Sequence, residues 1–169
     1  MRSPIPGSPI FSTSTGTLSA IFGATNLVAL AAWAILILLP RRPVAMASVL
    51  YLGVGLLCLV YTAVLALLVT GAVDPLRDAG LPPHDMADYS IDGLKSLFRS
   101  DGAIVLGWTH YLAFDLFVGL WIARDADAKG FSRLAQAPVL LATFLAGPLG
   151  LFTWLAIRER RARALGRWE

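Results

Sequence analysis

The feature that most constrains this chain is a set of four long apolar stretches. A bilayer core is about 30 Å thick, and a helix needs roughly 20 consecutive apolar residues to cross it. The four stretches cover residues 18–39, 44–70, 103–123 and 137–157. We therefore predict an all-α membrane protein in which residues 17–157 form a bundle of four transmembrane helices.

The composition excludes a water-soluble enzyme. Of the 169 residues, 57% are hydrophobic and only 15% are charged, whereas an ordinary soluble domain has about 25% charged residues. Twelve of the fourteen basic residues are arginine, which indicates a GC-rich bacterial genome. We expect a protein of the bacterial inner membrane, in contact with membrane lipids. Nucleic acid is not expected as a partner of so apolar a chain.

The segments outside the spans predict the orientation. Residues 1–16 are rich in Pro, Ser and Thr and are expected to be a flexible lead-in, and residues 158–169 form an Arg-rich tail. Four crossings place both of these segments and the 71–102 loop on one side, which then has nine basic residues against five. Because cytoplasmic loops carry the excess of Lys and Arg, both termini are predicted to be cytoplasmic. Arg41 and Arg42, in the turn after the first span, are expected at the level of the lipid headgroups.

The long loop before the third span contains one predicted helix. In residues 90–100 apolar and polar side chains separate onto two faces of a helix, and Ser90 is placed to cap it. This helix either lies in the membrane interface over one mouth of the bundle or packs on the ends of the spans. In the same loop, His84, Asp85, Asp88 and Asp92 match no ligand motif, so we predict a solvated acidic face and no metal site.

Asp115 is the most unusual residue of the apolar stretches. It lies twelve residues into the third span, about 18 Å from its start, where an ionisable side chain is costly and usually marks a functional site. The alternative is an anchor that hydrogen-bonds to another helix. Trp108, Tyr111 and Gly119 share its helical face. Tyr111 is placed to donate to the carboxylate, and Gly119 would let another helix approach closely.

Two further polar residues are candidate partners of Asp115. His110 precedes it by five residues, about 140° around the helix and about 7.5 Å along it, so the two side chains either flank a substrate or act separately. Asn26 in the first span needs a partner in lipid, and Asp115 is the expected one. In the fourth span, Gly147-Pro148-Leu149-Gly150 predicts a kink.

Two histidines are too few for a membrane di-iron oxygenase, and His84 in a loop and His110 in a span are not the well-placed pair that a transmembrane haem usually needs. The lone Cys58 has no partner for a disulfide. No nucleotide-binding or hydrolase motif is present either. We therefore expect no cofactor, and the remaining functions are redox-neutral acid–base chemistry, binding or assembly.

The third span and the segment Phe144–Gly150 carry a family resemblance. The stretch 107–125, GWTHYLAFDLFVGLWIARD, is similar to the membrane protein family that includes plant neoxanthin synthase, named after the fourth abscisic-acid-deficient locus. The resemblance covers about residues 18–157, and its core is Trp-x-His-x-Leu-Ala-x-Asp-Leu-Phe at 108–117. Arg124 and Asp125 also match the family pattern and are expected to anchor the helix at the membrane edge.

The resemblance implies the conversion of violaxanthin to neoxanthin, which opens an epoxide and creates an allene without net redox change. Such a step needs an acid at the epoxide oxygen and a base at the polyene, and we assign these roles to Asp115 and His110. The residues expected to bind the carotenoid or related isoprenoid are Trp108, Tyr111, Asn26, Phe114 and Gly119. The alternative is a non-catalytic subunit that binds pigment or lipid, or that assembles with other membrane subunits.

Overall fold

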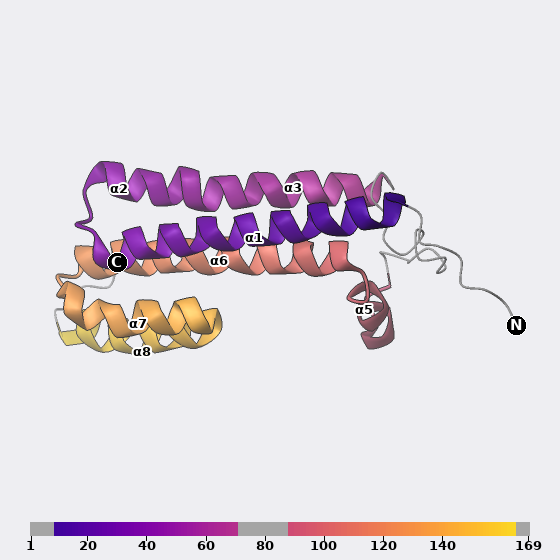
Figure 1. Cartoon of the computed structure of the whole chain (residues 1–169). Helices are drawn as coiled ribbons and strands as arrows, with labels where there is room; N and C mark the ends of the chain where they lie inside the picture. Colours follow the sequence, from indigo (N-terminus) through magenta and orange to yellow (C-terminus); the bar gives the residue numbers. More distant parts are fainter. Residues whose placement is uncertain (1–8, 71–87, 165–169) are drawn as a thin grey trace, which may run out of the picture. The chain divides into compact units, whose positions relative to one another are not determined.

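The computed structural model describes residues 9–70 and 88–164, and all of its regular elements are helices (Figure 1). In chain order they are α1 (Pro9–Leu38), α2 (Pro43–Ser48), the π-helical segment η1 (Val49–Gly55), α3 (Leu56–Val69), α5 (Ile91–Leu97), α6 (Asp101–Ala128), α7 (Arg133–Leu145) and α8 (Gly147–Ala164). The side chains described are those of residues 16–70 and 88–159. Residues 1–8, His84 and Asp85 lie outside these ranges.

Three of the predicted spans are present as long apolar helices. They cover Gly16–Leu38, Pro43–Val69 and Asp101–Ala128, and each is long enough to cross about 30 Å of lipid at 1.5 Å per residue. Pro40 and Pro43 flank the turn between the first two spans, and Pro43 occupies the start of α2, where the lack of an amide hydrogen costs nothing. These helices confirm an all-helical membrane protein.

The fourth predicted span is not a single helix. It is divided at Ala146, which adopts the non-helical angles φ −156° and ψ 80° between α7 and α8. With 13 residues, α7 is about 20 Å long, too short to cross the bilayer core. The kink expected at Gly147-Pro148 is therefore a complete break, and four crossing helices are not obtained.

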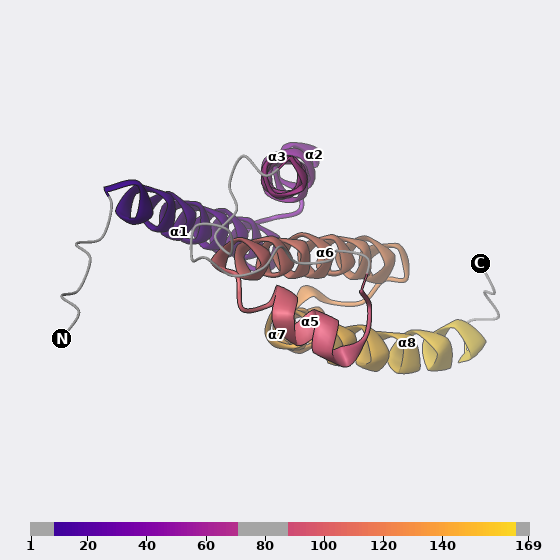
Figure 2. The same cartoon turned by 90° about the vertical axis from the view of Figure 1, so that its right-hand side faces the viewer.

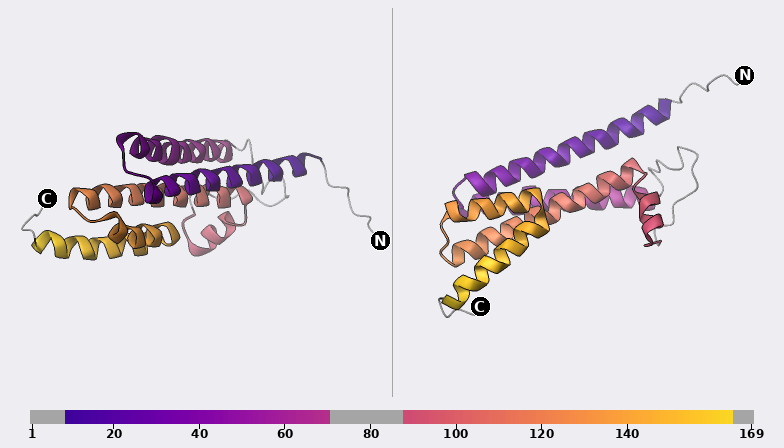
Figure 3. Two further views of the ribbon diagram at one scale, coloured as in Figure 1. Left: turned by 60° about the vertical axis from the view of Figure 1, so that its left-hand side comes forward. Right: turned by 90° about the horizontal axis from the view of Figure 1, so that it is seen from below.

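Contacts along α7 and α8 show that the chain reverses at this break. Gly150 packs so closely on Thr143 that a Cβ there would overlap its backbone, while the rings of Phe131 and Trp154 lie 5.1 Å apart. Residues close to the break contact each other, and residues further before it contact residues further after it, as in an antiparallel hairpin. In Figures 1 and 3, α8 returns toward the end at which α7 begins. We call this pair the α7–α8 hairpin.

The chain divides into two compact units, which we describe separately. The first unit comprises residues 1–26 and 58–110, and the second comprises residues 27–57 and 111–169. In the first unit, α5 confirms the helix predicted in the loop, and Ser90 Oγ accepts from the Gly93 amide at 3.0 Å. The Phe98 ring packs on Gly107, and α5 lies at an angle to α6 (Figure 2).

The second unit contains a core that joins α1, η1, α6 and the α7–α8 hairpin. Its largest buried side chains include Trp154, Leu36, Leu116 and Leu120. Gly119 admits the Trp33 indole, since a Cβ at this position would overlap the ring. The close approach predicted for Gly119 therefore occurs, but it is made by an aromatic side chain instead of a helix backbone.

Candidate functional site

The Asp115 carboxylate lies at the break of the α7–α8 hairpin, in the second unit. A Cβ on Gly147 would overlap the carboxylate, so the missing side chain of this glycine provides the space for it. Gly147 is the first residue of α8 and hydrogen-bonds to Asp115 through its backbone. The first amides of a helix lack partners within the helix and favour a negative charge. The carboxylate of α6 thus caps the start of α8.

This capping leaves one carboxylate oxygen without a partner. Asp115 Oδ2 is buried and has no hydrogen-bond partner among the residues that the structure describes. A buried polar atom without a partner is rare and costs about 1–3 kcal/mol. The contact with Gly147 is the helix-anchoring role expected as the alternative for Asp115, and it does not account for the second oxygen.

Tyr111 lies beside Asp115, as the helical spacing predicts. Its hydroxyl interacts with the carboxylate and is 3.4 Å from the Leu145 carbonyl oxygen at the end of α7. One turn further along α6, the Trp33 ring packs on Gly119 and meets the Phe144 ring edge to face at 5.6 Å. The site therefore combines an acid and a phenol in apolar surroundings.

Asn26, in the first unit, has a different partner from the one expected. Its Oδ1 accepts from the Trp108 indole at 3.1 Å, and its Nδ2 donates to the Phe22 carbonyl at 2.7 Å. The Phe22 and Trp108 rings lie 6.0 Å apart. The pairing of Asn26 with Asp115 was wrong, because its own helix and the indole satisfy both ends of the amide.

His110 also lies in the first unit, with its ring 5.6 Å from that of Tyr61. Asp115 belongs to the second unit, so the joint action of the two residues on a substrate stays a prediction. Phe114, another predicted binding residue, follows on α6 with 56% of its side-chain surface exposed.

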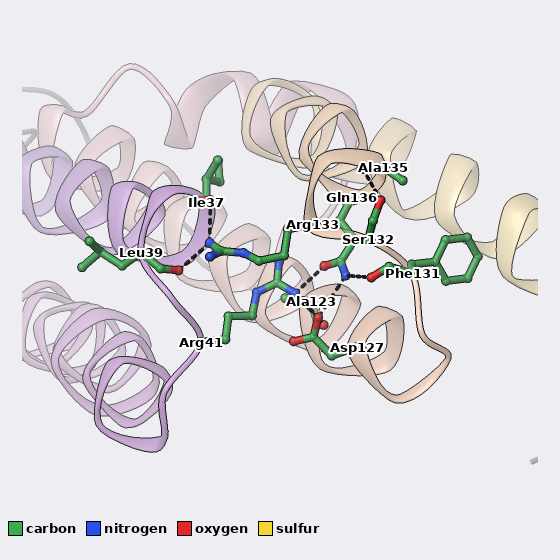
Figure 4. Close-up of polar contacts among 10 residues, drawn as sticks. All are labelled: Ile37, Leu39, Arg41, Ala123, Asp127, Phe131, Ser132, Arg133, Ala135 and Gln136. Atoms are coloured by element: carbon green, nitrogen blue, oxygen red, sulfur yellow. Dashed lines mark hydrogen bonds and ion pairs between the residues drawn. The ribbon is translucent and has the colours of Figure 1, made fainter.

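A polar network that the sequence did not predict surrounds Arg41 (Figure 4). The Arg41 side chain is only 7% exposed and donates to Asp127 at 2.6 Å, to the Ala123 carbonyl at 3.1 Å and to Gln136. Gln136 is fully buried and also donates to Asp127. Arg133 donates to the carbonyls that end α1, at Ile37 and Leu39. Arg41 is thus a buried structural residue, and of the arginine pair only Arg42 is exposed.

Asp125 forms a second network at the end of α6. Its carboxylate pairs with Lys129 at 3.2 Å and Arg158 at 2.7 Å, and accepts from the Trp154 indole at 3.1 Å. The spacing of Lys129 four residues after Asp125 was a signal for the first pair. No local pattern predicts the other two partners, which lie on α8. Asp125 thus holds α8 against α6.

Metal ligands do not gather in the described part of the chain. Among residues 9–70 and 88–164, no group of three or more His, Cys, Asp or Glu side chains is arranged to hold an ion.

Comparison with known proteins gives one match. No curated protein and no solved structure matches the chain. A family model described as ABA DEFICIENT 4-like matches residues 20–154, which include the three apolar spans, the α7 helix and the Asp115 site. Since the match covers most of the chain, this protein belongs to the ABA DEFICIENT 4-like family.

Proposed function

We propose that this protein is an integral membrane isomerase that acts on a carotenoid epoxide or a related apolar isoprenoid, with Asp115 as the proton donor. The observation that carries the proposal is the buried Asp115 Oδ2, which has no partner among the described residues. It lies inside an apolar span, where an ionisable group usually serves a function. Tyr111 interacts with the carboxylate, and the neighbouring residues Leu112 and Leu116 belong to the apolar core, in keeping with the mostly apolar lining of small-molecule sites.

The proposed reaction is redox-neutral. Asp115 gives its proton to the epoxide oxygen while the bond between that oxygen and one ring carbon breaks. A base removes a proton from the polyene, and the electron pair of that C–H bond forms the additional double bond of an allene. One proton enters and one leaves, so substrate and product have the same formula. The role of the base is assigned to His110.

The activity is tested by adding violaxanthin to membranes that contain the protein and analysing the pigments by chromatography and mass spectrometry. We expect a new pigment with the mass of the substrate, one epoxide fewer and one additional hydroxyl group. Membranes from cells that do not express the protein are the control. An unchanged pigment profile with folded protein, together with co-purifying large subunits, would contradict catalysis.

The alternative function, pigment or lipid binding in a larger assembly, is favoured by a different surface. Phe114, Phe117 and Trp121 follow one another at helical spacing on α6 and are 56%, 50% and 38% exposed. Such a stripe suits an elongated apolar ligand or a neighbouring subunit. Visible absorption of the purified protein, before and after substitution of these three residues by Leu, separates pigment binding from its absence.

The α7–α8 hairpin also changes the proposed orientation. With three crossings and a hairpin that returns to its starting side, the segments before α1 and after α8 lie on opposite sides of the membrane. Arg2, Arg77, Lys95 and Arg99 then face one side, and the other ten basic residues face the other. The positive-inside rule places the ten in the cytoplasm. Reporter fusions at the two ends test this, since a cytoplasmic signal at both would contradict it.

A further inference from the structure

The second unit contains a groove at the turn between α1 and α2. Its volume is about 600 Å³, within the range of roughly 300–1,000 Å³ that is typical of small-molecule sites. The lining residues are Ile35, Leu39, Pro40, Arg42, Val44, Ala45 and Ser48. All are apolar except Arg42 and Ser48, and the Ser48 hydroxyl is already bonded to the Val44 carbonyl at 2.9 Å. The groove therefore offers an apolar wall and one cation.

The position of the groove is set by the two spans that it joins. The first apolar span ends at Leu38 and the second begins at Pro43, so the turn between them lies where hydrocarbon gives way to headgroups. Leu39 and Val44, on the rim, are 48% and 77% exposed. A ligand at this level meets lipid chains on one side and water on the other.

The three arginines near the turn differ in their availability. Arg41 is bound to Asp127, Gln136 and a backbone carbonyl, and Arg133 is bound to two carbonyls at the end of α1. Arg42 is exposed, and no carboxylate among the described residues pairs with it. The positive charge at the groove is therefore free to bind an anion from outside the chain.

We propose that this groove binds an anionic phospholipid. The phosphate pairs with the Arg42 guanidinium, which presents several N–H donors in a planar arrangement suited to phosphate oxygens. An acyl chain lies along Leu39 and Val44 and covers their exposed surfaces. Basic pockets at the ends of membrane helices bind anionic headgroups in this way. The site is separate from Asp115 and does not depend on the proposed isomerase activity.

The test uses the full chain in nanodiscs that contain phosphatidylcholine with a minor share of phosphatidylglycerol. Native mass spectrometry of the ejected protein measures which lipid stays bound. We expect a preference for phosphatidylglycerol that falls about fivefold in Arg42→Ala, the effect of about one basic residue near a lipid surface. Arg124→Ala is the matched control, since Arg124 is also exposed but does not line the groove. Equal losses in both variants would overturn the proposal.

Two further measurements distinguish a lipid from a free anion. Ser48→Phe fills the groove without changing the charge, and we expect it to lose the bound lipid while its melting temperature stays close to that of the parent. Retention of the lipid in this variant would overturn the placement of the acyl chain. Inorganic phosphate is expected not to displace phosphatidylglycerol, and displacement at millimolar concentration would identify a simple phosphate site instead.

Discussion

Asp115 and Asp125 lie on the same helix of the same unit, but their carboxylates have different partners. Asp125 has two cationic partners and an indole donor, and its side chain is only 14% exposed. Asp115 interacts with the Gly147 backbone at the start of α8 and with the Tyr111 hydroxyl, but it has no cationic partner among the described residues and keeps a buried oxygen with no partner there. A carboxylate whose oxygens are all paired holds helices together, whereas one with a free oxygen inside the membrane can serve chemistry.

The comparison also explains the shape of the α7–α8 hairpin. Both aspartates hold α8: Asp115 at its first residue, Gly147, and Asp125 near its middle, through Trp154 and Arg158. A helix held at these two points by α6 runs back along it. Both aspartates therefore have a structural role, and only Asp115 also keeps a carboxylate oxygen that this role does not use.

The largest expected effect on stability is that of Asp125→Ala. This change removes the ion pairs of Asp125 with Arg158 and Lys129, whose side chains are 26% and 18% exposed. Breaking a buried pair from one side costs about 3–5 kcal/mol, and partial exposure lowers our expectation to about 2–3 kcal/mol of unfolding free energy. Denaturant titration in micelles measures this change in unfolding free energy. Isomerase activity per folded molecule should be unchanged, and its loss would remove the distinction between the two residues.

Gly147→Ala should have the next largest effect. The added Cβ overlaps the Asp115 carboxylate, so the carboxylate or the start of α8 must shift, at a cost of about 1–3 kcal/mol as for other overpacked sites. Gly23→Ala is the control, because a Cβ there has nothing within 4 Å. Thermal melting of the two variants compares them, and equal melting temperatures would contradict the close fit at Gly147.

The smallest effect is expected for Lys129→Met, which removes one ion pair of Asp125 and keeps most of the apolar stem of the side chain. Asp125 retains Arg158 and the Trp154 indole. An ion pair four residues apart on a helix contributes about 0.3–0.5 kcal/mol. The melting temperature should therefore fall less than in Asp125→Ala. A larger fall would show that Lys129, and not the contacts with α8, accounts for the stabilising effect of Asp125.

Sequence reasoning succeeded where the signal is local. Apolar length located three spans, the two-faced pattern after Ser90 located α5, and helical spacing placed Tyr111 beside Asp115. Each of these depends on residues close together in the chain. The family resemblance was likewise carried by one continuous stretch and is confirmed by the family match.

Sequence reasoning failed where the structure depends on contacts between residues far apart in the chain. A Gly-Pro pair is compatible with a kink or with a reversal, and the difference lies in contacts such as that of Trp154 with Asp125, 29 residues apart. No local pattern predicts the buried polar network of Arg41, because its acceptors, Asp127 and Gln136, are 86 and 95 residues away. The partner of Asn26 is the Trp108 indole, 82 residues away in sequence, and no local pattern points to it.

The most direct test of the account is Asp115→Asn, which keeps the shape of the side chain and removes the acid. Isomer formation from violaxanthin is measured per folded molecule, with the melting temperature determined on the same sample. We predict a loss of at least about 100-fold, the usual contribution of a positioned acid, with a small change in melting temperature. Full activity in this variant would contradict the account and leave Asp115 as a helix cap alone.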